Sequence, residues 1–142
     1  MAEDDPLDAE MTLRALSKHD LAGKVHWVRD GAEALDFLFS EGVYAGRGPE
    51  RFLKLVLLDI KMPKVDGIEV LRRVKSDDRT RLIPVVVMTS SSEDRDLVES
   101  YRLGVNSYVV KPVEAEAFLR VVSEIGIYWT LRNRAPTEAG SA

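Results

Sequence analysis

The chain has 142 residues, of which 45% are hydrophobic and 31% charged, with a formal net charge of −4. This composition is typical of one globular domain and excludes a disordered or fibrous protein. The lack of cysteine excludes disulfides and thiolate metal sites, and no apolar run reaches the ~18 residues that cross a bilayer. The acidic balance gives no general reason to bind nucleic acid. We therefore expect a cytoplasmic protein that contacts neither nucleic acid nor membrane.

Apolar segments with helical spacing alternate with short apolar runs typical of buried strands. In chain order they predict a helix over 7–16, a strand over 25–28, a helix over 34–39, a strand over 53–58, a helix over 68–74, a strand over 83–88, a helix over 97–104, a strand over 107–110 and a helix over 118–129. This order predicts an α/β fold with a parallel sheet and right-handed crossovers.

Chemically active side chains follow three of the predicted strands, namely Asp59, then Thr89 with Ser90, and Lys111. An acidic group over 3–5 precedes the first helix. The carboxyl ends of parallel strands form the working edge of such a sheet. Crowded carboxylates at this edge favour a hard cation such as Mg²⁺, and an aspartate can act as a nucleophile toward phosphorus. A metal and an ammonium group together would neutralise a transferring phosphoryl group.

Four segments, "EDDP", "LVLLDIKMPKVDG", "PVVVMTSS" and "NSYVVKP", resemble in order and spacing the motifs of response-regulator receiver domains of two-component systems. The resemblance implies a flavodoxin-like, doubly wound parallel sheet with strand order 2-1-3-4-5. It also implies a phosphoacceptor protein rather than an enzyme that turns over a substrate. A sensor histidine kinase would phosphorylate it in a Mg²⁺-dependent step, and a histidine phosphotransfer protein is a further expected partner.

The resemblance assigns a role to each matching position. Asp59 is the phosphoryl acceptor, Lys111 contacts the phosphoryl group, and Thr89 and Tyr108 are the switch residues. The metal ligands implied are Glu3, Asp4, Asp59 and the backbone carbonyl of Lys61.

Phosphorylation would turn Thr89 toward the phosphoryl group and let Tyr108 rotate inward. The face formed by the fourth helix, the last strand and the fifth helix would then change shape. Lys61 and Ser91 flank the pocket, and we expect slow self-dephosphorylation. The resemblance further implies a cis peptide bond before Pro112.

Two segments narrow the resemblance to the stand-alone receivers that partner bacterial phytochromes: residues 40–52 and "YWTLRNR" near the end. The last helix carries more apolar residues than one core face needs. We expect it to form a homodimer through Val121, Tyr128, Trp129 and Leu131. The receiver domain is expected over 1–131, followed by a flexible tail over 132–142.

One departure from the family pattern concerns the first, central strand. Only Met1 and Ala2 precede Glu3, so this strand is expected to be missing or truncated. The strands on either side would then be separated by roughly 10 Å. We expect the metal site to be the part most disturbed.

Other functions are possible for the same sheet. A phosphorylation-independent adaptor or dimerisation module would keep the fold without the chemistry. A dehalogenase-type phosphatase needs a second aspartate two residues after the nucleophile, and that position is Lys61. A flavin carrier needs a glycine- and hydroxyl-rich phosphate loop where this chain has "EDDPLDAE".

Overall fold

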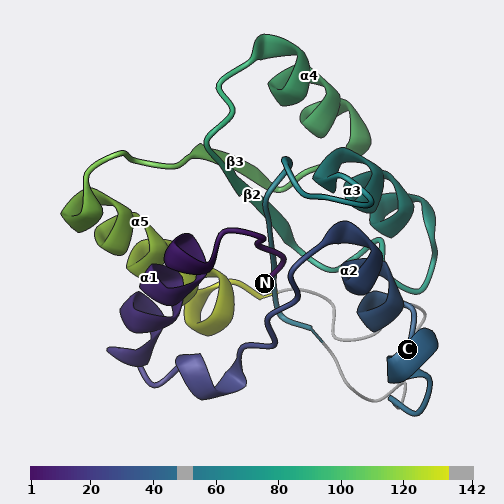
Figure 1. The fold of residues 1–142 in the computed structure, drawn as a ribbon, viewed down its shortest axis with the longest axis horizontal. Helices are drawn as coiled ribbons and strands as arrows, with labels where there is room; N and C mark the ends of the chain where they lie inside the picture. Colours follow the sequence, from purple (N-terminus) through teal and green to yellow (C-terminus); the bar gives the residue numbers. More distant parts are fainter. Residues whose placement is uncertain (48–52, 135–142) are drawn as a thin grey trace.

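The computed structural model describes residues 1–47 and 53–134 and shows a parallel sheet enclosed by helices (Figure 1). Within these residues three strands pair in the order β1-β2-β3: β1 (Val56–Leu58), β2 (Val85–Thr89) and β3 (Ser107–Val110). The α-helices are α1 (Pro6–Ser17), α2 (Gly31–Leu38), α3 (Gly67–Ser76), α4 (Asp94–Leu103) and α5 (Ala115–Ile127). Shorter helical turns are η1 (Ala22–Lys24), η2 (Gly42–Tyr44) and the π-helical η3 (Tyr128–Arg132). The α/β class predicted from the sequence is confirmed.

The register of the sheet brings the predicted chemical groups to one edge. Both strand pairings are parallel, and Thr89 at the end of β2 lies opposite Val110 of β3. Asp59 directly follows β1 and Lys111 directly follows β3. All residues of β1 and β2 are buried, which explains their nearly continuous apolar sequences.

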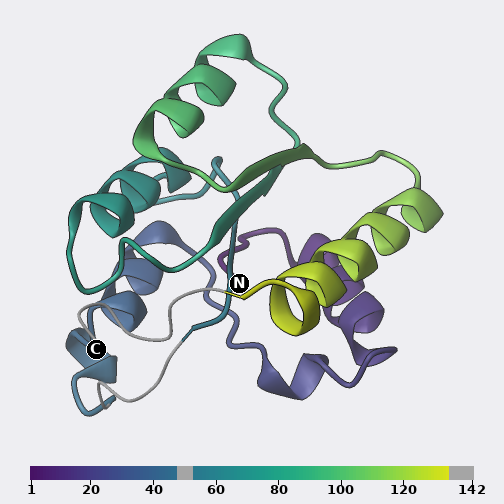
Figure 2. The ribbon, with the colours of Figure 1, turned by 180° about the vertical axis from the view of Figure 1, so that it is seen from behind.

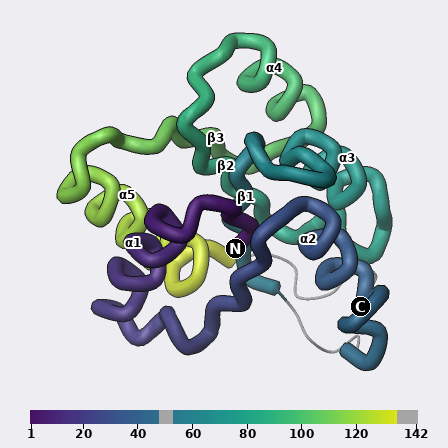
Figure 3. The backbone as a smooth tube through the Cα atoms, in the orientation of Figure 1, coloured from purple at the N-terminus to yellow at the C-terminus, as the bar shows by residue number. Residues whose placement is uncertain are grey.

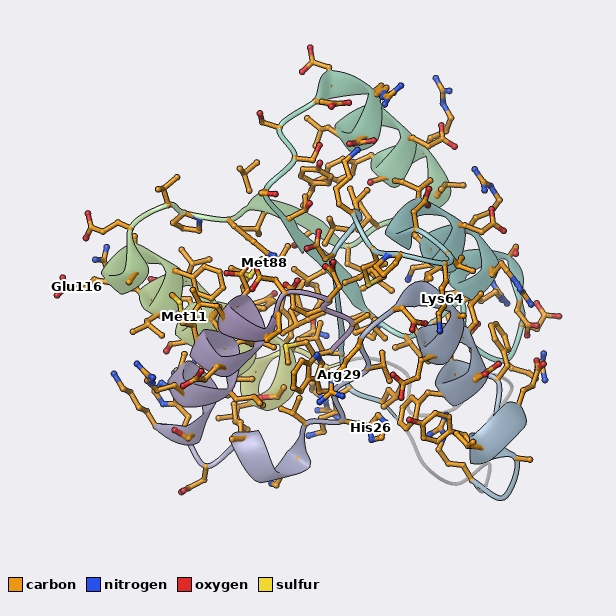
Figure 4. The ribbon with its side chains drawn as sticks, viewed as in Figure 1. Met11, His26, Arg29, Lys64, Met88 and Glu116 are labelled. Atoms are coloured by element: carbon orange, nitrogen blue, oxygen red, sulfur yellow. The ribbon has the colours of Figure 1, made fainter. Side chains whose placement is uncertain are left out.

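Helices cover both faces of the sheet, as the two opposite views show (Figure 1, Figure 2). On one face α1 packs along α5, and on the other α2, α3 and α4 pack side by side. Successive strand residues point to opposite faces. Val85 and Val87 therefore join the cluster under α2 and α3, while Met88 joins the cluster under α1 and α5. Figure 4 labels Met88 near the centre of the molecule and Met11 close to this second cluster. None of the helices in the described ranges is long and apolar enough to cross a bilayer.

Local signals fix the ends of several helices. Asp5, Asp30 and Asp66 each accept backbone N–H groups from the first turn of the helix that follows, so α1, α2 and α3 begin at aspartate caps. Helix α4 ends at Gly104, whose φ of +100° is the left-handed conformation expected from its position.

The N-terminus of the chain lies beside β1 in the middle of the fold (Figure 3). Ala2 forms parallel bridges with both Val28 and Leu58. Its amide donates to the Leu57 carbonyl at 2.8 Å, and its carbonyl accepts from the Asp59 amide at 3.1 Å. The central strand is thus reduced to one position that is paired on both sides. The expected gap is closed at the end of the sheet that carries Asp59.

Two strand predictions are wrong in part. Of residues 25–28 only Val28 forms a β-bridge, although the His26 carbonyl also accepts from the Met1 ammonium group at 2.8 Å. β1 begins at Val56 rather than at residue 53. A cavity of about 470 Å³ lies here, lined by Met1, His26 and Leu55 among others. A strand is held by hydrogen bonds to its neighbours, and no described segment runs between these two stretches. They therefore stay irregular despite their apolar sequences.

Gly67 allows α3 to begin directly against the end of β1. A Cβ atom at this position would lie 2.1 Å from the carbonyl oxygen of Asp59 and 2.7 Å from Cα of Ile60. Both neighbours are backbone atoms of the segment that holds the candidate acceptor, so neither can move without displacing it.

We predict that Gly67→Ala lowers the free energy of unfolding by about 1–3 kcal/mol, because the added methyl group overpacks the strand end. Urea unfolding measures this change. Gly23→Ala is the matched control, since nothing lies within 4 Å of a Cβ at Gly23. Equal losses of stability in the two variants would contradict the steric explanation.

Candidate functional site

Asp59 is held at the end of β1 by backbone and side-chain contacts. Its side chain is buried, with 7% of its surface exposed. Oδ1 accepts a hydrogen bond from the Lys61 amide at 3.3 Å, and Oδ2 accepts one from Lys111 Nζ at 2.9 Å. Both carboxylate oxygens therefore have a partner at the working edge of the sheet.

The acidic pair reaches the same edge because the N-terminal backbone is anchored. The Glu3 amide donates to the Val28 carbonyl at 3.0 Å, and the Trp27 indole Nε1 donates to the Glu3 carbonyl at 2.8 Å. Glu3 is buried and Asp4 is exposed. These contacts hold Glu3 beside Asp59 although only Met1 and Ala2 precede it. That the short N-terminus disturbs the metal site more than other parts stays a prediction.

Glu3, Asp4 and Asp59 together fit a divalent cation. One carboxylate oxygen from each lies within 4.8 Å of the others. A set of hard oxygen donors from carboxylates suits Mg²⁺, which is bound through a few carboxylates while keeping several waters. The carbonyl of Lys61, the fourth ligand implied by the resemblance, stays a prediction.

Lys111 is the centre of the charge network. Its Nζ donates to Glu3 Oε1 at 2.7 Å, to Asp8 Oδ2 at 2.8 Å and to Asp59 Oδ2 at 2.9 Å. An ammonium group has three donors, and all three are used. The described peptide bonds are all trans, so the expectation of a cis bond before Pro112 is wrong. Trans is the intrinsically favoured form of a peptide bond before proline.

Burial and charge pairing set the protonation of this network. Burial alone would lower the pKa of Lys111, but its hydrogen bonds to Asp8, Glu3 and Asp59 outweigh burial and raise the pKa, so the ammonium stays charged. Burial raises the pKa of Glu3 to about 7, against the opposing influence of Lys111. Glu3 therefore takes up a proton near neutral pH.

Asp8 is a site residue that sequence reasoning missed. It lies in the first turn of α1, three residues after the N-cap Asp5, and its side chain is 26% exposed. An acidic residue in a first turn is ordinarily explained by the helix dipole. Helical spacing gave no signal for it, because its partner Lys111 lies outside α1.

The two switch residues meet at Ser91. The Thr89 hydroxyl is fully buried and accepts a hydrogen bond from the Ser91 amide at 3.2 Å. The Tyr108 hydroxyl donates to the Ser91 carbonyl at 2.9 Å, and the Tyr108 side chain packs partly against the core. Their roles in switching stay predictions, but the contacts link both residues to one loop.

Lys61 and Ser91 flank the site, and both contact Asp96, a second residue that the sequence did not reveal. The Ser91 hydroxyl donates to Asp96 Oδ2 at 2.6 Å, and Lys61 Nζ lies 3.6 Å from the same oxygen. Asp96 is buried in the first turn of α4.

The residues expected to form a dimer differ in their surroundings. Val121 packs partly against the cluster under α1 and α5. Tyr128 and Leu131 are exposed, at 51% and 64% of their surface. Trp129 makes an edge-on contact with Tyr128, with ring centroids 5.2 Å apart. The tail expected over 132–142 begins at the last residue of η3, and 135–142 lie outside the described residues.

Residues 1–123 match the response regulator receiver domain family. The chain therefore belongs to this family, the receiver domains of two-component signalling, and the resemblance inferred from the four segments is confirmed.

Solved relatives agree in both sequence and fold. The phosphorylated cyanobacterial phytochrome response regulator RcpA is 37% identical, with a TM-score of 0.88 over 95% of this chain and 94% of that chain. The bacteriophytochrome response regulator AtBRR is 53% identical, with a TM-score of 0.71 over 94% of each chain. The Mn²⁺-bound form of Rcp1 is 32% identical, with a TM-score of 0.83 over 95% of each chain.

Two curated relatives cover most of the chain. Response regulator Rcp1 of Synechocystis is 33% identical over 91% of this chain and 86% of its own. The probable methanogenesis regulatory protein FilR2 of Methanothrix harundinacea is 43% identical over 98% of this chain and 87% of its own. The chain is thus similar to phytochrome response regulators and also to a regulator named for methanogenesis.

We predict that Mg²⁺ binds more weakly as the pH falls from 8 to 6. With its pKa raised to about 7, Glu3 carries a proton below that pH, and the metal must displace it. The dissociation constant should rise by up to about tenfold per pH unit below pH 7. Isothermal titration calorimetry at several pH values measures this. In Glu3→Gln the amide does not titrate, so binding should be weaker but nearly independent of pH; an equal pH slope in both proteins would contradict the assignment.

Proposed function

We propose that Asp59 accepts a phosphoryl group from the phosphohistidine of a sensor kinase. A carboxylate oxygen of Asp59 attacks the phosphorus, a P–O bond forms as the P–N bond breaks, and the departing imidazole keeps the electron pair and takes up a proton. The observation that carries this proposal is the buried contact of 2.9 Å between Lys111 Nζ and Asp59 Oδ2. It places a nucleophilic carboxylate and a fixed cation together, as phosphoryl transfer requires.

Glu3, Asp4 and Asp59, with the Lys61 carbonyl, would hold Mg²⁺ in the active protein. When bound, this ion supplies positive charge that offsets the charge of the phosphoryl oxygens. The Mn²⁺-bound structure of Rcp1 and the clustered carboxylates support this part of the proposal. Lys111 would move its hydrogen bond from Asp59 to a phosphoryl oxygen, and the Thr89 hydroxyl would donate to another.

The phosphorylated site would act on partners through the face formed by α4, β3 and α5. Thr89 and Tyr108 both contact Ser91 at the start of this region, so a change at Thr89 reaches Tyr108 through one residue. This face carries exposed apolar side chains, which a protein partner could cover. They are Val98, Tyr101, Val110 and Val113.

A phytochrome-type histidine kinase is the partner that we propose. The likeness to RcpA and AtBRR, over nearly the full length of both, supports it. FilR2 is named for methanogenesis regulation, so the signal that reaches this chain is a separate question from the chemistry of Asp59.

We also propose that the C-terminal arm pairs two copies of the chain. Tyr128 and Leu131 expose large apolar surfaces in η3, directly after α5. An isologous contact would let each copy bury the same side chains of the other.

We predict that a small phosphodonor such as acetyl phosphate adds one phosphoryl group to the protein, and only when both Mg²⁺ and Asp59 are present. Intact mass spectrometry measures the adduct. Asp59→Asn keeps the size of the side chain but removes its nucleophilic charge and should give none. The lack of an adduct on the folded wild-type chain with Mg²⁺ would refute the phosphoacceptor and favour an adaptor.

We predict that Leu131→Asp weakens self-association by about tenfold or more, because a charge would be buried in the contact. Sedimentation velocity over a range of concentrations measures this. Leu7→Asp is the control, since Leu7 on α1 is exposed to nearly the same extent, at 63%. A wild-type chain that stays monomeric at high concentration would overturn the pairing.

A further inference from the structure

Asp96 makes contacts that its place in the helix does not explain. It lies in the first turn of α4, where a carboxylate often caps the helix or interacts with its dipole. Here the N-cap residue is Glu93, which makes no side-chain cap, and Asp96 is buried with 8% of its surface exposed. Burying a carboxylate is costly unless it is hydrogen-bonded. The side chain that satisfies it is Ser91, from the loop after β2.

The bond between Ser91 and Asp96 is the stronger of the two that Asp96 makes. It is a buried, charge-assisted hydrogen bond of 2.6 Å, the kind that contributes most to stability. The second contact, at 3.6 Å, is to Lys61, whose side chain is 53% exposed and therefore screened by water. Asp96 thus fixes Ser91 firmly and draws the Lys61 ammonium toward α4 more weakly.

Ser91 is bound through every polar atom that it has. Its amide donates to Thr89, its carbonyl accepts from Tyr108, and its hydroxyl donates to Asp96. The hydroxyl also accepts from the Glu93 amide at 3.4 Å, within the same loop. Any turn of Thr89 toward a phosphoryl group must break the first of these bonds, and any rotation of Tyr108 must break the second. Ser91 would then keep only the bonds of its hydroxyl group, of which the bond to Asp96 is much the shorter.

We infer that Asp96 is a positioning residue that holds the loop over 90–93, between β2 and α4, in its resting conformation and opposes the change that phosphorylation drives. We call the contacts of Asp96 with Ser91 and Lys61 the clasp. The inference rests on the proposed function for its link to phosphorylation, and on the structure alone for the clasp itself. The clasp ties α4 to the loops after β1 and β2, which leave the sheet at the edge that carries Asp59 (Figure 1, Figure 2). The phosphoryl group can shift the loop from its resting to its switched conformation only by the free energy with which it favours the switched one. Weakening the clasp destabilises the resting conformation, so the phosphoryl group must supply less free energy.

Hydrogen exchange of the unphosphorylated protein tests the clasp directly. In Ser91→Ala and Asp96→Asn the amides of the loop over 90–93 should exchange about tenfold faster, the effect of losing or weakening one charge-assisted hydrogen bond. Asp94→Asn is the matched control, because Asp94 is exposed in the same helical turn and the change in charge is the same. Unchanged exchange in both Ser91→Ala and Asp96→Asn would overturn the inference.

The rate of phosphorylation by acetyl phosphate tests the link to the switch. Asp96→Asn and Ser91→Ala should be phosphorylated faster than the wild type by a similar factor, and combining them should add little, because both break one bond. Faster loop exchange with an unchanged phosphorylation rate would overturn the role in switching. Failure of the wild type to be phosphorylated would refute the proposed function instead, and the exchange result would still decide the clasp.

Discussion

One ammonium group allows four acidic side chains to share a small region of this fold. Glu3, Asp8 and Asp59 each hydrogen-bond to Lys111, and Asp4 lies beside two of them. Carboxylates brought this close would repel one another, and a buried ammonium without partners would lose its charge. The ammonium group therefore reduces the repulsion between the carboxylates, and the carboxylates keep the ammonium group charged. The site depends on this mutual neutralisation, and a divalent cation would take over part of it.

Backbone geometry places these charges. Lys111 follows β3 in register with β2, and Asp59 follows β1, so the sheet sets the distance between the Asp59 carboxylate and the Lys111 ammonium group. Glu3 depends on a smaller device, the pairing of Ala2 on both sides. This pairing occurs at the end of the sheet that carries the chemistry, whereas the irregular stretches and the cavity lie toward its other end. The stretches without strand pairing are thereby kept away from Asp59.

Site residues whose positions follow from strand order could be predicted from the sequence. Site residues whose positions depend on how helices pack could not. Asp59, Thr89 and Lys111 could be placed together because each stands at the end of a segment with the apolar pattern of a strand. Asp8 and Asp96 could not, because acidic residues in first turns have a common local explanation. The strand over 25–28 failed for a related reason: its apolar pattern was present, but pairing needs a neighbouring segment that pattern alone does not show.

The contacts of Lys111 join distant parts of the chain. Its partners Glu3, Asp8 and Asp59 lie 108, 103 and 52 residues away along the sequence. Closing loops of this length costs conformational entropy before any contact can repay it, and such non-local contacts slow folding. During synthesis on the ribosome, the acidic N-terminus must wait until nearly the whole receiver has emerged before it meets its cation. A nascent chain therefore lacks the charge network around Lys111 until β3 is in place.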